Sequence, residues 1–208
     1  MDRKLKKWEL CLMFGLLCAL FSGAWLEREQ TELSGRVIRL HVIANSDTEA
    51  DQALKLRVRD RILEEAAGYF QAGETVEEAA AKLTEHLPAL AEAGAQVVRE
   101  AGYDYPVSAS LEPNVWFPTK TYTDFSLPAG SYTALRIVIG EGEGRNWWCV
   151  VFPPLCLGSV TETVEETACT GGFTRSEVAL ITGETEGYVV KFKAMELWDE
   201  FKEWTGRW

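Results

Sequence analysis

The spacing of apolar residues changes from a strand pattern to a helix pattern within the first third of the chain. Residues 36–44 alternate between two sides, one of which is wholly apolar, and this predicts a strand that enters a core. After Asn45 the apolar positions recur every three to four residues, which predicts a helix. Ser46 and Glu49 have the spacing of a capping box at its start, and the glycine-containing stretch at 68–73 ends it.

A second helical segment follows directly. Thr75 and Glu78 form another capping box, and apolar residues again recur at helical spacing behind it. Pro88 suits the first turn of a helix, so the pattern favours a break there and a further helix that stops at Gly102. We therefore expect one strand followed by two or three helices.

From Tyr105 the chain has the composition of strands, with many β-branched and aromatic residues. Strand-like segments occupy residues 107–111, 115–122, 132–139 and 147–152. Short connections between them predict antiparallel pairing, and helices grouped ahead of strands predict an α+β fold. We expect an antiparallel sheet of about five strands, with helices packed mainly on one of its faces.

The last quarter of the chain has weaker patterns. Residues 157–187 are rich in Thr, Glu and Gly, so we expect a weakly ordered stretch with a short helix at 176–181. An extended segment is expected at 188–192. A closing helix then carries an apolar side formed by Leu197, Trp198, Phe201 and Trp204.

The N-terminus has the organisation of an export signal. Four basic residues lie within the first nine, and residues 10–26 carry no charge and include the small series Ser22, Gly23 and Ala24. This order predicts a signal peptide at 1–24, followed by a single domain at 25–208. An uncleaved membrane anchor is the alternative. Either reading places the domain outside the cytoplasm.

Overall charge narrows the classes of partner. The chain has 208 residues, with 21 Lys plus Arg against 32 Asp plus Glu and a net charge of -11. Nucleic-acid binding requires a basic face, so this balance argues against a nucleic-acid partner. It also disfavours anionic membrane surfaces, and we expect membrane contact only through the N-terminal segment.

Three cysteines remain after export, and exported thiols tend to pair. Cys149 and Cys156 lie on either side of Pro153 and Pro154, which can turn the chain and bring the two sulfurs together, so we predict this disulfide and leave Cys169 unpaired. Three buried small side chains are the alternative. The cysteine and histidine spacing does not predict a zinc site, and we expect no metal and no cofactor.

Polar residues follow the first strand at a position that can bind anions. His41, Asn45 and Asp47 lie where a strand meets the N-terminus of a helix. Helix capping and turn formation explain the last two without any ligand. A hydrolase that uses His41 and Asp47 is one further hypothesis. The glycines at 140–144 resemble a phosphate loop, but a strand follows them instead of a helix, so they predict a hairpin.

One basic cluster and several aromatic residues are candidates for partner contact. Basic residues at 55, 57, 59 and 61 form either a solvated helix face or a docking patch for an acidic partner. Adjacent tryptophans on a strand must face opposite sides, and Trp is enriched in contact hot spots. The aromatic and proline candidates are Trp116, Phe117, Pro118, Trp147, Trp148, Pro153 and Pro154. A cell-wall glycan-binding module is a third hypothesis.

Four segments, taken together, resemble the stage II sporulation protein R family of endospore-forming bacteria. They are RLHVIANSDTEADQALKLRVRDRIL at 39–63, VWFPTKTY at 115–122, PAGSYTALRIVIGEGEGRNWWCVVFPPLC at 128–156 and VKFKAMELWDEF at 190–201. The resemblance implies a non-enzymatic signal that is exported from the forespore into the space between its two membranes. There it would activate a membrane-embedded aspartic protease of the mother cell, which processes the precursor of sigma factor E.

We expect the activating surface at one end of the sheet. Its first candidates are the Asn45 to Asp47 turn, Arg57 and Arg61 on the following helix, and the segment Trp116, Phe117, Pro118. His41 beside the turn, the pair Trp147 and Trp148, and the Pro153, Pro154 turn are the other partner-binding candidates.

Overall fold

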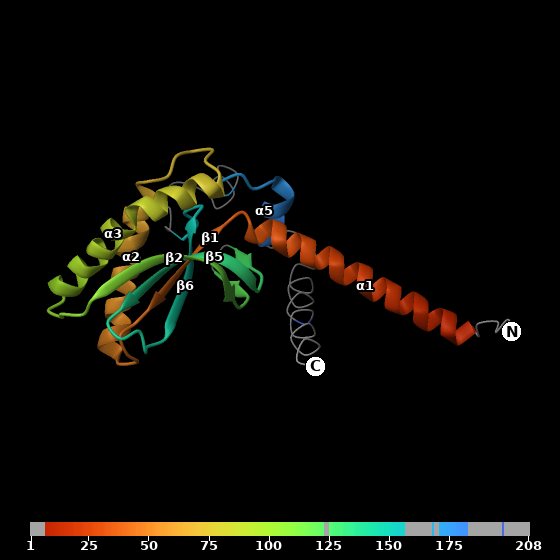
Figure 1. Cartoon of the computed structure of the whole chain (residues 1–208), viewed down its shortest axis with the longest axis horizontal. Helices are drawn as coiled ribbons and strands as arrows, with labels where there is room; N and C mark the ends of the chain where they lie inside the picture. Colours follow the sequence, from red (N-terminus) through yellow and green to blue (C-terminus); the bar gives the residue numbers. More distant parts are fainter. Residues whose placement is uncertain (1–6, 123–124, 157–167, 169–170, 183–196, 198–208) are drawn as a thin grey trace.

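A computed structural model describes residues 7–122, 125–156, 168, 171–182 and 197. Its elements run in the order α1 (Lys7–Ser34), β1 (Ile38–Ile43), α2 (Glu49–Ala67), α3 (Val76–Glu100), β2 (Val107–Phe117), β3 (Lys120–Thr121), β4 (Ser126–Leu127), β5 (Gly130–Ile139), β6 (Asn146–Phe152) and α5 (Arg175–Thr182). Figure 1 shows α2 and α3 on one side of the sheet and α1 extending away from it. Cys169, the extended segment at 188–192 and most of the closing helix lie outside the described residues.

The two helices after β1 begin differently from one another. Thr48 caps α2 by accepting a hydrogen bond from the Asp51 backbone N–H, so the capping box expected at Ser46 and Glu49 is wrong. The Ser46 hydroxyl is engaged instead with the Asp51 carboxylate. Helix α3 begins with the expected capping box of Thr75 and Glu78, which is confirmed.

Helix α3 runs through Pro88 without a break, so the expected third helix is wrong. A proline inside a helix removes one backbone hydrogen bond. Burial of the helix offsets the loss of this hydrogen bond. Leu83, Leu90 and Val97 lie seven residues apart on one buried face that continues across the proline.

The main sheet has four strands in the order β2-β5-β1-β6. Strand β1 is parallel to β5 and antiparallel to β6, and β2 is antiparallel to β5. The α+β class is confirmed, while the expectation of a wholly antiparallel sheet is wrong for the pair β1 and β5. Two helices, instead of one, return the chain to the end of the sheet where β1 finished, so β2 runs against β1 and β5 runs with it.

Strand β1 lies between β5 and β6, although these two follow one another in sequence. Their connection at 140–145 therefore passes over the end of β1 and does not close the simple hairpin expected from the glycines. The strand expected at 115–122 is also divided. Its first part belongs to β2, after a register shift between Glu112 and Val115, and its second part forms the small sheet of β3 and β4.

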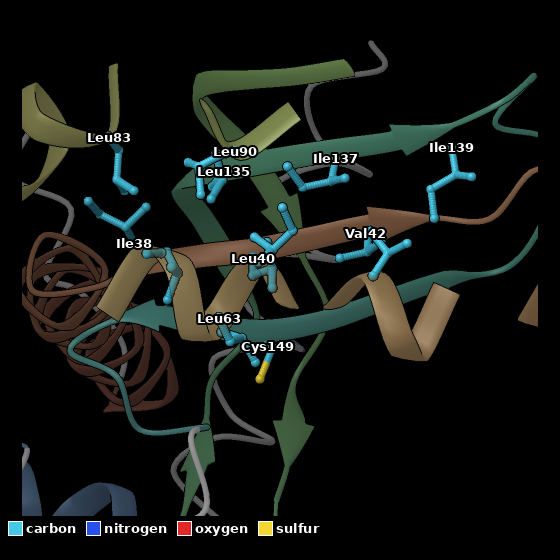
Figure 2. Packing of buried hydrophobic residues seen from close by; sticks show 14 of the residues in the cluster. Ile38, Leu40, Val42, Leu63, Leu83, Leu90, Leu135, Ile137, Ile139 and Cys149 are labelled. Carbon is cyan, nitrogen blue, oxygen red and sulfur yellow. The ribbon is translucent and has the colours of Figure 1, made fainter. Parts of the chain in front are cut away.

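The larger hydrophobic core lies between the sheet and the helix pair. Ile38, Leu40 and Val42 alternate along β1 and meet Leu63 of α2 and Leu90 of α3 (Figure 2). All five are at least 96% buried. Burying such side chains contributes about 1.5–3 kcal/mol each, so this layer supplies much of the stability of the domain.

The disulfide between Cys149 and Cys156 is present, as expected. The two Cα atoms are 6.4 Å apart, and Cys149 is buried in the helix-side core (Figure 2). The Val150 backbone N–H points toward the Cys156 sulfur at 3.2 Å. The disulfide therefore holds the chain that follows β6 against β6.

The opposite face of the sheet has a second, smaller core. It contains Leu33 of α1, Val37, Phe117, and Val178 of α5. Helix α5 begins and ends within one residue of the expected helix at 176–181. Arg36 joins this layer to the first strand, because its guanidinium donates to the Gly172 carbonyl and the Glu177 carboxylate.

The side chains described in the first half of helix α1 are largely exposed. Its apolar side chains are exposed at Leu12, Phe14, Leu16 and Phe21, whereas Leu33 near its end is buried. Among the described residues, no helix combines the length and apolar character needed to cross a membrane. The signal peptide at 1–24 stays a prediction.

Candidate functional site

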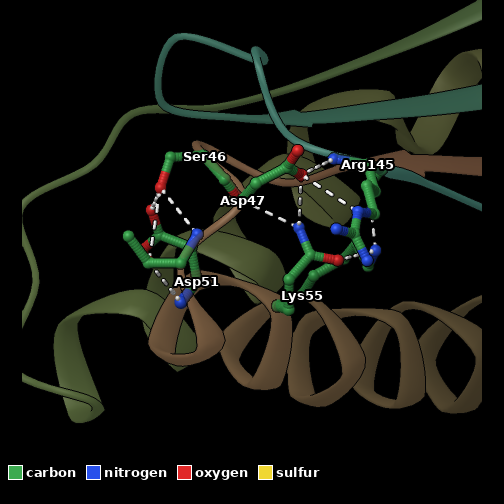
Figure 3. Close-up of polar contacts among 7 residues, drawn as sticks. Ser46, Asp47, Asp51, Lys55 and Arg145 are labelled. Carbon is green, nitrogen blue, oxygen red and sulfur yellow. Dashed lines mark hydrogen bonds and ion pairs between the residues drawn. The ribbon is translucent and has the colours of Figure 1, made fainter.

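A polar network holds the turn after β1, centred on Asp51 (Figure 3). Ser46 Oγ and Asn45 Nδ2 donate to Asp51 Oδ2 at 2.6 and 2.9 Å. These hydrogen bonds lower the pKa of Asp51, which is buried in the first turn of α2. The carboxylate thus takes the position in which a helix N-terminus could bind an external anion.

The 140–145 connection is bound to the same turn. The Glu141 N–H donates to Asn45 Oδ1 at 3.1 Å, and the Arg145 N–H donates to Asp47 Oδ1 at 2.7 Å. A Cβ atom on Gly144 would lie 2.3 Å from the Ser46 carbonyl oxygen, so only glycine allows this close approach. Asn45 and Asp47 therefore join two loops, which favours their structural interpretation.

Lys55 is buried in the next turn of α2 and does not belong to the exposed basic face that its spacing indicated. Its Nζ donates to Gln52 Oε1 at 2.6 Å and to the Arg145 carbonyl at 2.8 Å. Burial lowers the pKa of Lys55. This lysine stabilises the loop junction shown in Figure 3.

The remaining basic residues of α2 have separate roles. The guanidinium carbon of Arg59 lies 4.5 Å from the ring centroid of Trp147, which covers that tryptophan on the helix side of β6. Arg61 forms an ion pair with Glu65 at 2.6 Å. Arg57 is exposed. Of this cluster, Arg57 and Arg61 face solvent enough to meet a partner.

The aromatic candidates fall into two groups. Trp116 is 55% exposed, whereas its neighbour Phe117 is completely buried and Pro118 is partly buried. Trp147 packs against the helix-side core and Trp148 against the opposite core, so the expectation that they face opposite sides is confirmed. We therefore find one tryptophan among these three with a largely free surface.

The prolines after β6 are largely withdrawn from solvent. Pro153 is buried, and a Cβ atom on Gly171 would collide with its ring. Pro154 is partly buried. Their position follows the end of β6 that pairs with the beginning of β1.

The register of the sheet separates the residues that we expected to find at one end. Trp116 pairs with Ser131 at the start of β5, whereas Ile43, next to the Asn45 turn, pairs with Val138 near its end. Seven residues of extended strand span about 23 Å. The single surface expected from the turn and the Trp116 segment is therefore wrong as a geometry. The part of each residue in partner binding stays a prediction.

Four side chains on the face opposite the helices form a row across all four strands. Register places Ser110 of β2 beside Arg136 of β5, Arg136 beside His41 of β1, and His41 beside Trp148 of β6. We call Ser110, Arg136, His41 and Trp148 the cross-strand row. All four are partly exposed.

His41 lies in the middle of this row. Its Nε2 is 2.9 Å from Asn146 Oδ1, so this nitrogen carries the proton, and its ring lies 6.1 Å from both Phe117 and Trp148. Burial lowers the pKa of His41, and the neighbouring Arg136 acts in the same direction. His41 is therefore neutral at neutral pH.

Arg39 lies two residues before His41 on β1, on the same face of the sheet, and is completely buried. Its guanidinium carbon is 4.4 Å from the Phe117 ring centroid and 5.0 Å from that of Tyr132, and Nη2 is 3.1 Å from the Tyr122 hydroxyl. Cation–π contacts offset part of the cost of burying its charge. Nε and Nη1 have no hydrogen-bond partner.

The hydrolase hypothesis receives no support from these positions. His41 contacts Asn146, while Asp47 accepts hydrogen bonds from Arg145 and Gln52 in the loop junction. The Ser46 hydroxyl is engaged with Asp51. In the described part of the chain, no three His, Cys, Asp or Glu side chains are grouped to hold a metal ion.

Sequence reasoning missed several residues of these two regions, chiefly Asp51, Lys55, Arg136 and Ser110. Arg136 is the only charged residue of β5. It alternates with Leu135 and Ile137, which face the helix-side core, so the sequence could have placed Arg136 on the other face of the sheet. Ser110 gave no signal, because its importance comes only from its place beside β5.

Comparison with known proteins relates most of this geometry to one family. The family model described as stage II sporulation protein R matches residues 34–162. A relative with that name from Bacillus subtilis (strain 168) is 35% identical over 131 residues, which cover 63% of this chain and 58% of the relative. No solved structure matches the chain. The segment at 190–201 lies outside the family match.

Proposed function

The chain belongs to the stage II sporulation protein R family, and we propose that it acts as an exported sporulation signal. In this proposal the protein leaves the forespore and works in the space between the two membranes. It there activates a membrane-embedded aspartic protease of the mother cell, which processes the precursor of sigma factor E. The family match carries the proposal, because it includes the whole four-stranded sheet and both helices packed on it.

The N-terminal helix supports export. Its apolar residues, among them Phe14 and Phe21 at 70% and 74% exposure, are not used by the described core. An apolar segment that the fold does not bury suits a signal peptide or an anchor, and the basic residues before it suit retention of the extreme N-terminus in the cytoplasm. The disulfide between Cys149 and Cys156 suits an oxidising compartment outside that membrane.

A binding role, without catalysis, fits the contacts of the residues that resembled a catalytic site. Asn45, Ser46 and Asp47 are engaged with Asp51 and with the 140–145 connection. Trp116 offers a large exposed aromatic surface, and tryptophan is among the residue types most enriched in contact hot spots.

The glycan-binding hypothesis receives less support. Sugar-binding platforms need several aromatic rings that are open to solvent, whereas Arg59 covers Trp147 and Trp148 is only partly exposed beside Phe117. A pull-down against purified cell-wall glycan tests this alternative cheaply, and retention of the domain on the glycan would favour it over signalling.

Co-expression tests the proposed function. The full chain is produced together with the candidate protease and the sigma factor E precursor, and cleavage of the precursor is followed on immunoblots. We expect cleavage only when all three are present. A protease that cleaves equally well without the chain would refute the proposal.

A further inference from the structure

We propose that the cross-strand row binds a carboxylate side chain on an acidic segment of the partner protein. In this site Arg136 is the anion-binding side chain, His41 is its neighbour, and Trp148 contacts the apolar part of the bound segment. The inference rests on the proposed function only in that a protein partner is engaged outside the cytoplasm.

The first support is the placement of the row. Backbone pairing across β2, β5, β1 and β6 fixes the order Ser110, Arg136, His41, Trp148, so the four side chains emerge side by side from rigid strands. Helices α2 and α3 pack on the other face. Sites built on strands hold their donors more firmly than sites built on loops.

The second support is the set of nitrogen atoms that have no hydrogen-bond partner. Arg136 Nε and His41 Nδ1 are withdrawn from solvent and unpartnered. Arg39, two residues before His41 on the same face of β1, is completely buried and has two further nitrogens without partners. Buried polar groups are normally paired, and the unpaired Nε–H of Arg136 costs free energy that an incoming acceptor recovers, whereas His41 Nδ1 becomes a donor only when the ring is protonated.

The third support is the charge of this face. The charged and histidine side chains that its strands contribute are Arg39 and His41 of β1, Arg136 of β5 and Glu112 of β2, and β6 contributes no charged residue. Arg136 is 3.4 Å from Glu112, which also accepts a hydrogen bond from Ser110 at 2.9 Å. The pair of Arg136 and Glu112 is neutral as a whole, so the net positive charge of this face comes from the buried Arg39, within a chain whose net charge is -11.

These features favour an acidic protein segment over a polyanion. Arg136 pairs with Glu112 through Nη1, and its guanidinium fork has further donors that match the geometry of one additional carboxylate. Long polyanions, such as nucleic acid or an anionic lipid surface, would be repelled by the acidic remainder of the protein. The aromatic ring of Trp148 supplies apolar contact area next to the charge.

Carboxylate binding has a specific consequence for His41. Its Nε2 proton is held by Asn146, so neutral His41 presents a lone pair at Nδ1. A carboxylate at the row favours protonation of Nδ1, and the imidazolium then becomes a second donor to it. A bound carboxylate therefore raises the pKa of His41, whereas an uncharged ligand leaves it unchanged.

A peptide titration tests the site directly. The isotope-labelled full chain is titrated with N-acetyl-Leu-Glu-Leu-amide and, as the matched control, with N-acetyl-Leu-Gln-Leu-amide. We expect the Glu peptide alone to shift the Arg136 Nε–H and Trp148 indole resonances and to raise the pKa of His41. Equal effects of both peptides, no effect of either, or preferential binding of phosphatidylglycerol vesicles at these residues would overturn the proposal.

Variants connect the site to signalling. Arg136→Glu and the milder Arg136→Gln should reduce precursor cleavage in the co-expression assay about tenfold or more, and Arg136→Lys should reduce it less. Arg99→Glu, an exposed arginine on α3, is the control and should cleave normally.

The two proposals fail in different ways. If Arg136→Gln folds, as judged by its melting temperature, and cleaves normally, the site is wrong and the proposed function stands. If the wild-type chain produces no cleavage, the proposed function is wrong, and the peptide titration still decides the site.

Discussion

Asp51 is the residue on which the loop junction after β1 depends most. It accepts hydrogen bonds from Ser46 and Asn45 while buried in the first turn of α2. Asp51→Asn removes the charge and replaces one carboxylate oxygen by an NH2 donor next to the part-buried donors of Ser46 and Asn45. We expect a loss of about 1–3 kcal/mol in the free energy of unfolding, measured by urea denaturation.

Asp60→Asn is the matched control for this change. Asp60 is exposed and pairs with the adjacent Arg59 on the outer side of α2. Exposed ion pairs contribute little, so we expect a change within about 0.5 kcal/mol. Equal losses for the two variants would contradict the role assigned to Asp51.

His41 gives the domain a specific sensitivity to acid. Burial lowers its pKa below 6.5, so the unfolded chain takes up a proton at this residue at a higher pH than the folded protein does. Stability therefore falls as the pH drops below about 6.5. Arg136 strengthens this effect, whereas Glu112 and the hydrogen bond to Asn146 oppose it.

His41→Gln should remove this part of the pH dependence. We expect the wild-type chain to lose more unfolding free energy than the variant between about pH 7.5 and about pH 5.5, in urea denaturation at each pH. Parallel losses in the two proteins would show that His41 does not carry the effect.

The sequence revealed residue types at these positions more readily than their roles. Asn45 and Asp47 were recognisable as turn residues from local preference alone. Their bonds to the 140–145 connection join segments almost a hundred residues apart, and no local pattern specifies such a contact.

At the scale of elements, the glycine connection at 140–145 determines how β5, β1 and β6 fit together. Gly144→Ala would place a methyl group against the Ser46 carbonyl, which is backbone and cannot turn aside. We expect a loss of about 1–3 kcal/mol in the free energy of unfolding. Gly35→Ala is the control, because its added Cβ would meet the Thr31 carbonyl oxygen at 3.4 Å, an ordinary contact.

Destabilisation of both glycine variants by the same amount would show that loss of glycine flexibility, and not the contact with Ser46, is responsible. The comparison is made by urea denaturation of both proteins under the same conditions.

Elements with local signals were predictable, and their pairing was not. The capping box of α3 and the short helix α5 were found from neighbouring residues. The parallel pairing of β1 with β5 depends on two intervening helices, and the insertion of β1 beside β6 depends on contacts between distant segments. Neither arrangement leaves a trace in the periodicity of the strands themselves.

At the scale of the whole molecule, the two ends of the main sheet lie apart, with the cross-strand row between them. Trp116 is exposed at the end of the sheet where β5 begins. The 140–145 connection and the Asn45 turn lie at the opposite end. Any partner that contacts both must therefore extend along the sheet.

Trp116→Ala tests the exposed end. Because the side chain is 55% exposed, we expect the variant to keep its melting temperature and near-UV dichroism. Loss of a hot-spot tryptophan commonly costs about 2 kcal/mol, or roughly thirtyfold in affinity, so precursor cleavage should fall sharply. A folded variant that activates normally would place the docking surface elsewhere.

The central claim is that the protein signals from outside the cytoplasm, and compartment exchange tests it most directly. Three forms are compared for precursor cleavage: the full chain, residues 25–208 alone, and residues 25–208 behind an unrelated cleavable signal peptide. We predict cleavage with the first and third forms and none with the second, and near-UV dichroism checks that the second is folded. Full cleavage by residues 25–208 confined to the mother-cell cytoplasm would contradict the claim.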